Sequence, residues 1–239
     1  MKPFKYILIF ITILLFNACD KNNPIDITEV NTSIQSISGK ISGWHLGSDK
    51  EVILLGNENP TEVFARSKVD SEGNFNLTKL SAPTKIVYNT VNPLFINERI
   101  ISNTVTCSDS SAMEIWGYLC IVNVGDTSNN VIGRIFKGKF SNTTKINYDS
   151  FDPGDFTTAY ICTDKDVNVS GRIESKYLSA YDNKQYHIIT DYNLSYKKGW
   201  NKEVSLIKAK EITSDSIYVE SSCSNAEQDG GYWIYHDGH

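Results

Sequence analysis

The sequence lacks the short motifs that mark the common catalytic centres. It has no Gly-x-Ser-x-Gly nucleophile turn, no His-Glu-x-x-His pair and no glycine-rich phosphate-binding loop. It also has no Cys-x-x-Cys spacing, which leaves little support for a zinc site or a thioredoxin-like centre. We therefore expect a protein that is not an enzyme and that holds no metal or other cofactor.

Basic charge and helical periodicity are also scarce. Lysine and arginine together number 23 against 28 aspartate and glutamate residues, which gives a net charge of −5. Nucleic acid is bound through clustered basic side chains, so this balance excludes nucleic acid as a partner. Apolar residues do not recur at a spacing of 3.6 over any long stretch, so the sequence predicts no long helix.

The most apolar run of the chain stands at its N-terminus. Lys2 and Lys5 precede the apolar segment from Tyr6 to Phe16, and the small residue Ala18 stands just before Cys19. This order predicts an export signal with a cleavage point. The run is eleven residues long. It is too short to remain in the membrane as a spanning helix, which needs about 20 residues.

The stretch Leu15-Phe16-Asn17-Ala18-Cys19 resembles a bacterial lipobox, in the relaxed form of Bacteroidota-type lipoproteins. It departs from the stricter pattern at Asn17, where a small residue is commoner. The resemblance implies that Cys19 is acylated on its thiol and becomes the first residue of the mature protein. It also implies a lipid-anchored protein of the cell envelope, at the outer membrane, whose leaflet facing stays open. The alternative is an ordinary cleaved signal with a chance cysteine.

Removal of the signal makes the chain more acidic. It leaves 21 lysine and arginine residues against 28 aspartate and glutamate residues, a net charge of about −7. Such a chain has no polybasic segment for anionic lipid, so attachment to the membrane must come from the acyl chains. The predicted organisation is a signal peptide at 1–18, a polar tether at 19–34, a first domain at 35–110 and a second domain at 111–239.

Alternation of apolar and polar residues begins after the tether. Val63, Ala65 and Val69 lie at spacings of two or four, and Phe75 and Leu77 alternate with polar residues. A period of two with turn residues between the runs is typical of antiparallel sheets with one solvated face. We therefore predict an all-β protein with two antiparallel β-sandwich domains.

Residues 36–88 resemble a carboxypeptidase-regulatory-like, or transthyretin-like, domain. The strongest element is the Val-Asp-x-x-Gly-x-Phe-x-Leu pattern at 69–77, in which the glycine shapes a turn and the apolar residues fill a sandwich. The resemblance implies a seven-stranded Greek-key sandwich that acts as a spacer, stabiliser or interaction module. It implies no catalytic residues.

The C-terminal part is also predicted to consist of strands. Met113 to Val124 is apolar on both faces, which indicates a strand at the centre of its sheet. Residues 96–107 read as one further strand. Segments 163–167 and 194–202 resemble a strand pair of uncharacterised Bacteroidota-type lipoproteins, which implies only a sandwich of unknown role. The boundary between the domains and the oligomeric state stay open.

Four cysteines follow Cys19, and an exported chain can oxidise them. They allow three pairings that the sequence does not rank. The alternative is that they are small apolar residues of a core. The four are Cys107, Cys120, Cys162 and Cys223.

Aromatic residues gather near the C-terminus, where some could stack on a sugar ring or on an apolar patch of a partner. Trp200, Trp233 and His187 are the candidates for ligand contact. Buried indoles would favour a scaffold, and a flat exposed pair would favour capture of a glycan or peptide. Asp215-Ser216-Ile217 is similar to the short Bacteroidota O-glycosylation sequon, which makes Ser216 a candidate for modification.

Two acidic patterns have simpler explanations than a site. Asp164-x-Asp166-x-Asn168 begins like a calcium loop, but Val169 and Ser175 stand where such a loop needs glycine and glutamate. Asp152 and Asp155 flank Pro153-Gly154 and could be paired carboxylates for sugar cleavage, although a Pro-Gly turn with solubilising aspartates is the simpler explanation. The favoured function is a binding or scaffolding module with an envelope protein or glycan as partner. Glycan or peptide capture is the rival, and an envelope hydrolase the remote alternative.

Overall fold

The computed structural model describes residues 33–56, 62–84, 88–89, 99–143, 150–180 and 182–237. Within these ranges the chain forms strands and no helix, which confirms the all-β class. No helix in this part of the chain is long and apolar enough to cross a membrane. The predicted signal peptide, Cys19 and residues 20–32 of the tether lie outside the described residues.

The strands are numbered in chain order. They are β1 (Ser36–Ser42), β2 (Lys50–Gly56), β3 (Val63–Lys68), β4 (Asn74–Thr78), β5 (Tyr88–Asn89), β6 (Arg99–Asn103), β7 (Thr106–Cys107), β8 (Met113–Asn123), β9 (Gly133–Lys139), β10 (Phe156–Thr163), β11 (Val167–Leu178), β12 (Gln185–Tyr196), β13 (Gly199–Ile212), β14 (Ser216–Ser224) and β15 (Tyr232–His236).

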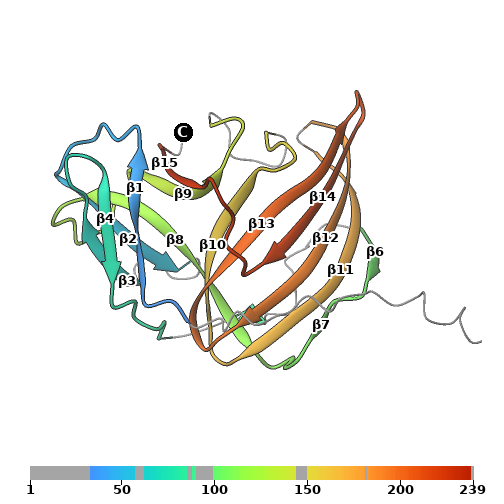
Figure 1. The fold of residues 1–239 in the computed structure, drawn as a ribbon, viewed down its shortest axis with the longest axis horizontal. Helices are drawn as coiled ribbons and strands as arrows, with labels where there is room; N and C mark the ends of the chain where they lie inside the picture. Colours follow the sequence, from blue (N-terminus) through green and yellow to red (C-terminus); the bar gives the residue numbers. More distant parts are fainter. Residues whose placement is uncertain are drawn as a thin grey trace, which may run out of the picture. The chain divides into compact units, whose positions relative to one another are not determined.

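The strands join in one large mixed sheet. Its order is β4-β1-β15-β9-β8-β10-β13-β14-β12-β11-β6, with β2 and β3 attached through β8. Most neighbours are antiparallel, but β1 pairs with β15 and β12 pairs with β14 in parallel. Figure 1 shows β1 to β4 at the left of the view and the long curved strands β10 to β14 at the right.

Separate sandwich domains are not confirmed. Residues 31–239 form one compact unit. Strands of the predicted first domain pair with strands of the predicted second, because β2 lies along β8 and β1 along β15. One hydrophobic cluster also draws on both parts of the chain, with Ile37, Val52 and Phe75 from the first and Tyr160 and Trp233 from the second.

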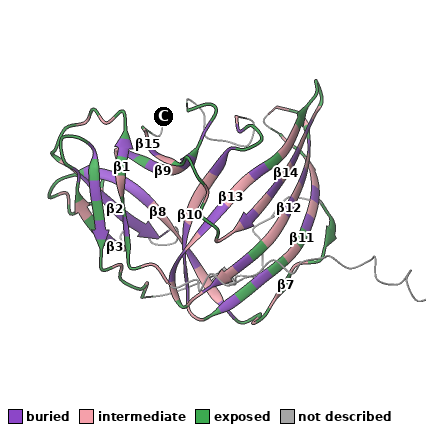
Figure 2. Ribbon diagram, in the orientation of Figure 1, coloured by how far each residue is buried: buried purple, intermediate pink, exposed green. Residues whose placement is uncertain are grey.

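Strand β8 has the central position that its two apolar faces predict. It pairs with β2, β9, β10 and β5 along different parts of its length. Every residue of β2 except Lys50 is buried against it. Figure 2 shows the resulting concentration of buried residues along β2 and β8.

The turn at 70–73 forms as predicted. Asp70 accepts hydrogen bonds from the backbone N–H groups of Glu72 and Asn74, both at 2.9 Å, and Gly73 takes a positive φ of 89°. Such a φ strains any residue with a side chain. The strands on either side do not pair with each other in a ladder, since β4 pairs with β1 and β3 pairs with β2.

The prediction of a single strand at 96–107 is wrong in one respect. Its described part is divided into β6 and β7, which both pair with β11. The division falls at Thr104 and Val105, which pass close to Gly171 of β11. A Cβ atom on Gly171 would lie 2.4 Å from the Thr104 carbonyl oxygen, so only glycine permits this approach.

Candidate functional site

Trp200, one of the predicted contact residues, is buried. It lies on β13 with 3% of its surface exposed, and its indole N–H donates to the Ser81 carbonyl at 2.8 Å. Its ring packs on Phe64 with centroids 5.2 Å apart. Gly117 of β8 makes room for the ring, because a Cβ atom there would lie 2.7 Å from it. The indole therefore joins β13 to β8 and β3.

Trp233 is buried in the same cluster from the C-terminal strand β15. It is 5% exposed and packs on Phe75 and Tyr160, with ring centroids 5.0 and 6.3 Å away. Gly39 of β1 lies directly against the indole, since a Cβ atom there would be 2.0 Å from Nε1. Both indoles thus occupy the core rather than the surface, which is the arrangement that favours a scaffold.

His187 is the one predicted contact residue on a solvated face. It lies on β12, with Nε2 2.8 Å from Oε1 of Glu174 on β11. Its ring meets the edge of Tyr218 on β14, with centroids 5.3 Å apart and planes at 75°. The side chains of His187 and Glu174 keep 27% and 28% of their surface exposed. These two contacts of His187 connect the neighbouring strands β11, β12 and β14.

A group of charged residues continues this face. Arg172 binds Asp191 through two nitrogen atoms, at 2.7 and 3.2 Å, and Glu220 at 3.2 Å. Lys208 reaches Asp191 at 3.0 Å, and the Arg172 and Lys208 contacts lower the pKa of Asp191. We call the combined surface the outer polar face; it consists of Arg172, Glu174, His187, Asp191, Lys208, Tyr218 and Glu220.

A second group of polar side chains lies on the buried side of the sheet. Glu203 of β13 is 9% exposed and accepts a short hydrogen bond from the Tyr196 hydroxyl of β12. The thiol of Cys223 on β14 also donates to it. Burial raises the pKa of Glu203, and the two hydrogen bonds oppose that effect. Burial likewise raises the pKa of Tyr196, and the charges of Glu203 and Glu114 add to the rise.

Glu114 of β8 completes this group. The carboxylate accepts the indole N–H of Trp116 at 3.0 Å. Burial raises the pKa of Glu114 to about 7, the Trp116 hydrogen bond acts in the opposite direction, and the charge of Glu203 raises it further. We call this group the acid cluster; it consists of Glu114, Trp116, Tyr196, Glu203 and Cys223.

No pattern in the sequence predicts the acid cluster. Its β8 members lie far along the chain from those on the consecutive strands β12, β13 and β14, so no local spacing joins the whole group. The available signal was Glu114, the one charged residue of the mostly apolar strand β8, whereas β13 carries several charged residues and gives no such signal for Glu203. A glutamate is seldom buried without a partner, and such a position therefore indicates either a functional group or a missing counter-charge.

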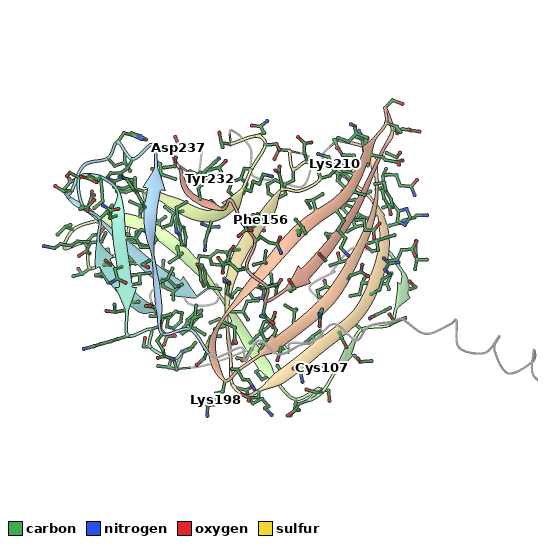
Figure 3. All side chains as sticks on the ribbon, in the orientation of Figure 1. Cys107, Phe156, Lys198, Lys210, Tyr232 and Asp237 are labelled. Atoms are coloured by element: carbon green, nitrogen blue, oxygen red, sulfur yellow. The ribbon has the colours of Figure 1, made fainter. Side chains whose placement is uncertain are left out.

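The acidic patterns at 164–168 and 152–155 have structural roles. Asp166 accepts the Lys198 N–H at 2.9 Å and pairs with the Lys197 ammonium at 3.0 Å, which fixes the turn between β12 and β13. Figure 3 labels Lys198 at the lower edge of the sheet, where Cys107 also lies. No group of acidic, histidine and cysteine side chains suited to a metal ion occurs among the described residues.

Asp155 is buried in its turn and Asp152 is exposed. Asp155 accepts hydrogen bonds from the hydroxyl and the N–H of Ser141 and from the N–H of Asp152, all at 2.9 Å. Both oxygen atoms of Asp155 therefore hold the turn in place.

The remaining candidates are distributed over the fold. Ser216 begins β14, where its hydroxyl lies 2.7 Å from the Thr213 hydroxyl. Of the four described cysteines, Cys120, Cys162 and Cys223 are buried free thiols, and Cys107 is half-buried. Cys120, Cys162 and Cys223 are therefore small residues of the core, which is the alternative to disulfide pairing. No protein-family model, curated protein or solved structure matches the chain.

Proposed function

We propose that this chain is a lipid-anchored protein of the cell envelope that acts as a binding or scaffolding module. The N-terminal pattern ending at Cys19 supports the anchor. The burial of Trp200 and Trp233 is the observation that supports the module, because it commits the two large aromatic candidates to the core. The anchor on Cys19 would hold the unit at the outer membrane, without catalysis.

The outer polar face is the surface that we assign to the partner. Its ion pairs join the four strands β11 to β14 of a continuous sheet, so its side chains are held in place before a partner arrives. Ordered side chains lose less conformational entropy on binding than free ones. Charges of both signs around the Tyr218 ring suit an envelope protein with complementary charges, because Tyr and Arg are enriched at the centres of protein interfaces.

Site-specific cross-linking in the native envelope tests this assignment. A photoreactive residue in place of Tyr218 in the full-length chain is expected to give one discrete protein adduct. Combining it with Glu174→Ala and His187→Ala should lower the adduct yield about tenfold, because the contact surface loses two ordered side chains. Thr127, an exposed residue in the loop between β8 and β9, is the control position and should give no adduct. The same yield at both positions, or an adduct insensitive to the two substitutions, would reject the proposed surface.

Glycan or peptide capture by an accessory lipoprotein is the second candidate. The partly exposed His187–Tyr218 pair favours it, in place of the buried indoles. Binding of residues 20–239 to a glycan array, with loss of the signal in a His187→Ala variant, would establish this alternative. An envelope hydrolase remains the most remote possibility. Its carboxyl groups would have to come from the acid cluster, because Asp155 is occupied in its turn.

We also propose three finer features of this chain, which concern Ser216, residues 36–88 and the number of folding units. O-glycosylation of Ser216 is proposed from its sequence pattern alone. The transthyretin-like description of residues 36–88 is supported by the turn at 70–73. The shared core of residues 31–239 favours a single folding unit over two separate sandwiches.

A further inference from the structure

The acid cluster contains two carboxyl groups without a cation. Neither Glu114 nor Glu203 forms a salt bridge with any lysine, arginine or histidine of the described residues. Glu203 instead contacts the hydroxyl of Tyr196 and the thiol of Cys223, and Glu114 contacts the indole of Trp116. Glu203 is buried and Glu114 is half-buried. A carboxylate withdrawn from water without a counter-charge is costly, and its protonated form is favoured.

The strands bring these two groups to the same side of the sheet. Strand β10 lies between β8 and β13, with Thr163 opposite Glu114 and Ala159 opposite Glu203. Tyr196 approaches from the end of β12, and Cys223 approaches from β14. Among the described side chains, the titratable groups that contact Glu203 are the Tyr196 phenol and the Cys223 thiol, and the Ser205 hydroxyl donates to that thiol. Cys107 and Tyr192 pack against the same hydrophobic cluster.

We propose that the packing of β12 and β14 against β8 and β13 depends on protonation of Glu114 and Glu203, which makes the protein sensitive to the pH of its surroundings. The two neutral carboxyl groups accept the hydrogen bonds of their neighbours, and the strands pack closely around them. Loss of a proton leaves a negative charge near a second carboxyl group, and the described residues offer no cation to balance it. The interior then loosens along β12 and β14.

The sign of the effect follows from the direction of the pKa shifts. An unfolded chain releases the Glu114 proton near the ordinary value of 4.5, whereas the folded chain holds it until about pH 7. The folded state therefore binds more protons in this interval, and stability falls as pH rises through it. The stabilisation is fully present below the unfolded pKa and is lost as pH passes the folded pKa. The raised pKa of Glu203 extends the fall in the same direction.

Thermal unfolding of residues 20–239, which contain the whole compact unit, tests the proposal. The wild type should lose about 5–10 °C in Tm from about pH 5 to about pH 8. Glu114→Gln should make this slope clearly smaller and leave the part that Glu203 contributes, because glutamine keeps the shape but cannot ionise. Glu211→Gln on the exposed end of β13 is the control and should leave the slope unchanged. A wild-type Tm that stays level or rises, or a Glu114→Gln variant with the wild-type slope, would overturn the proposal.

A second measurement on the unaltered chain covers the case in which the variants do not fold. The infrared band of protonated carboxyl groups should be present near pH 5.5 and should decrease with a midpoint near 7. If the band is already absent near pH 5.5, both carboxyl groups are ionised and the proposed device does not exist. The proposal is independent of the lipid anchor and of the outer polar face.

Discussion

Gly39→Ala is expected to destabilise the protein by about 3 kcal/mol or more, since a side chain at this position cannot be accommodated without moving an indole. The added Cβ atom would lie 2.0 Å from Nε1 and 2.3 Å from Cδ1 of Trp233. Trp233→Ala should cost a similar amount, about 3–5 kcal/mol, for the opposite reason, because it leaves a cavity. Urea unfolding of residues 20–239 measures both changes in the free energy of unfolding.

Gly230→Ala supplies the comparison. Gly230 has a positive φ of 77° and no atom within 4 Å of a Cβ position, so alanine there should cost only about 1 kcal/mol. In the double variant Gly39→Ala with Trp233→Ala, the new methyl group enters the space that the indole vacates. The double variant should therefore lose less free energy of unfolding than the two single variants lose in sum. Strict additivity, or a Gly39→Ala variant as stable as the wild type, would show that the indole does not pack on β1.

Cys19→Ser in the full-length chain should move the protein from the membrane fraction to the soluble fraction. The described residues include no membrane-crossing helix, and the acidic chain offers no electrostatic attachment to anionic lipid. Two or more acyl chains hold a protein firmly, so their loss should release nearly all of it. Fractionation of the envelope with immunoblotting, together with the mass of the mature N-terminus, measures the change.

Asn17→Ala is the matched control for this experiment. It brings the sequence closer to the stricter lipobox and should leave the membrane fraction unchanged. A wild-type N-terminus without fatty acid, or a Cys19→Ser protein that stays in the membrane fraction, would contradict the proposed anchor.

The local structure was accessible from the sequence because a period of two is a local property. The alternation at 63–77, the two apolar faces of β8 and the turn at Asp70 and Gly73 each depend on neighbouring residues alone. The residues around a strand also determine which of its faces is buried. These features account for the success of the all-β prediction.

The pairing of the strands was not accessible in the same way. Strand β1 lies beside β15, at the opposite end of the described chain, and no local pattern indicates this parallel contact. The burial of Trp233 depends on the same pairing, because Gly39 creates the space for the indole. The acid cluster has the same origin, since Glu114 and Glu203 come to the same side of the sheet only after β8, β10 and β13 have joined.

The accessibility of Trp200 and Trp233 tests the central claim most directly. The double variant Trp44→Phe with Trp116→Phe leaves these two as the only tryptophans of the chain. Acrylamide quenching of its fluorescence should be weak and its emission shifted to short wavelengths, because both indoles are buried in the core. Emission and quenching like those of free tryptophan in water would show that the indoles are exposed and would contradict their place in the core.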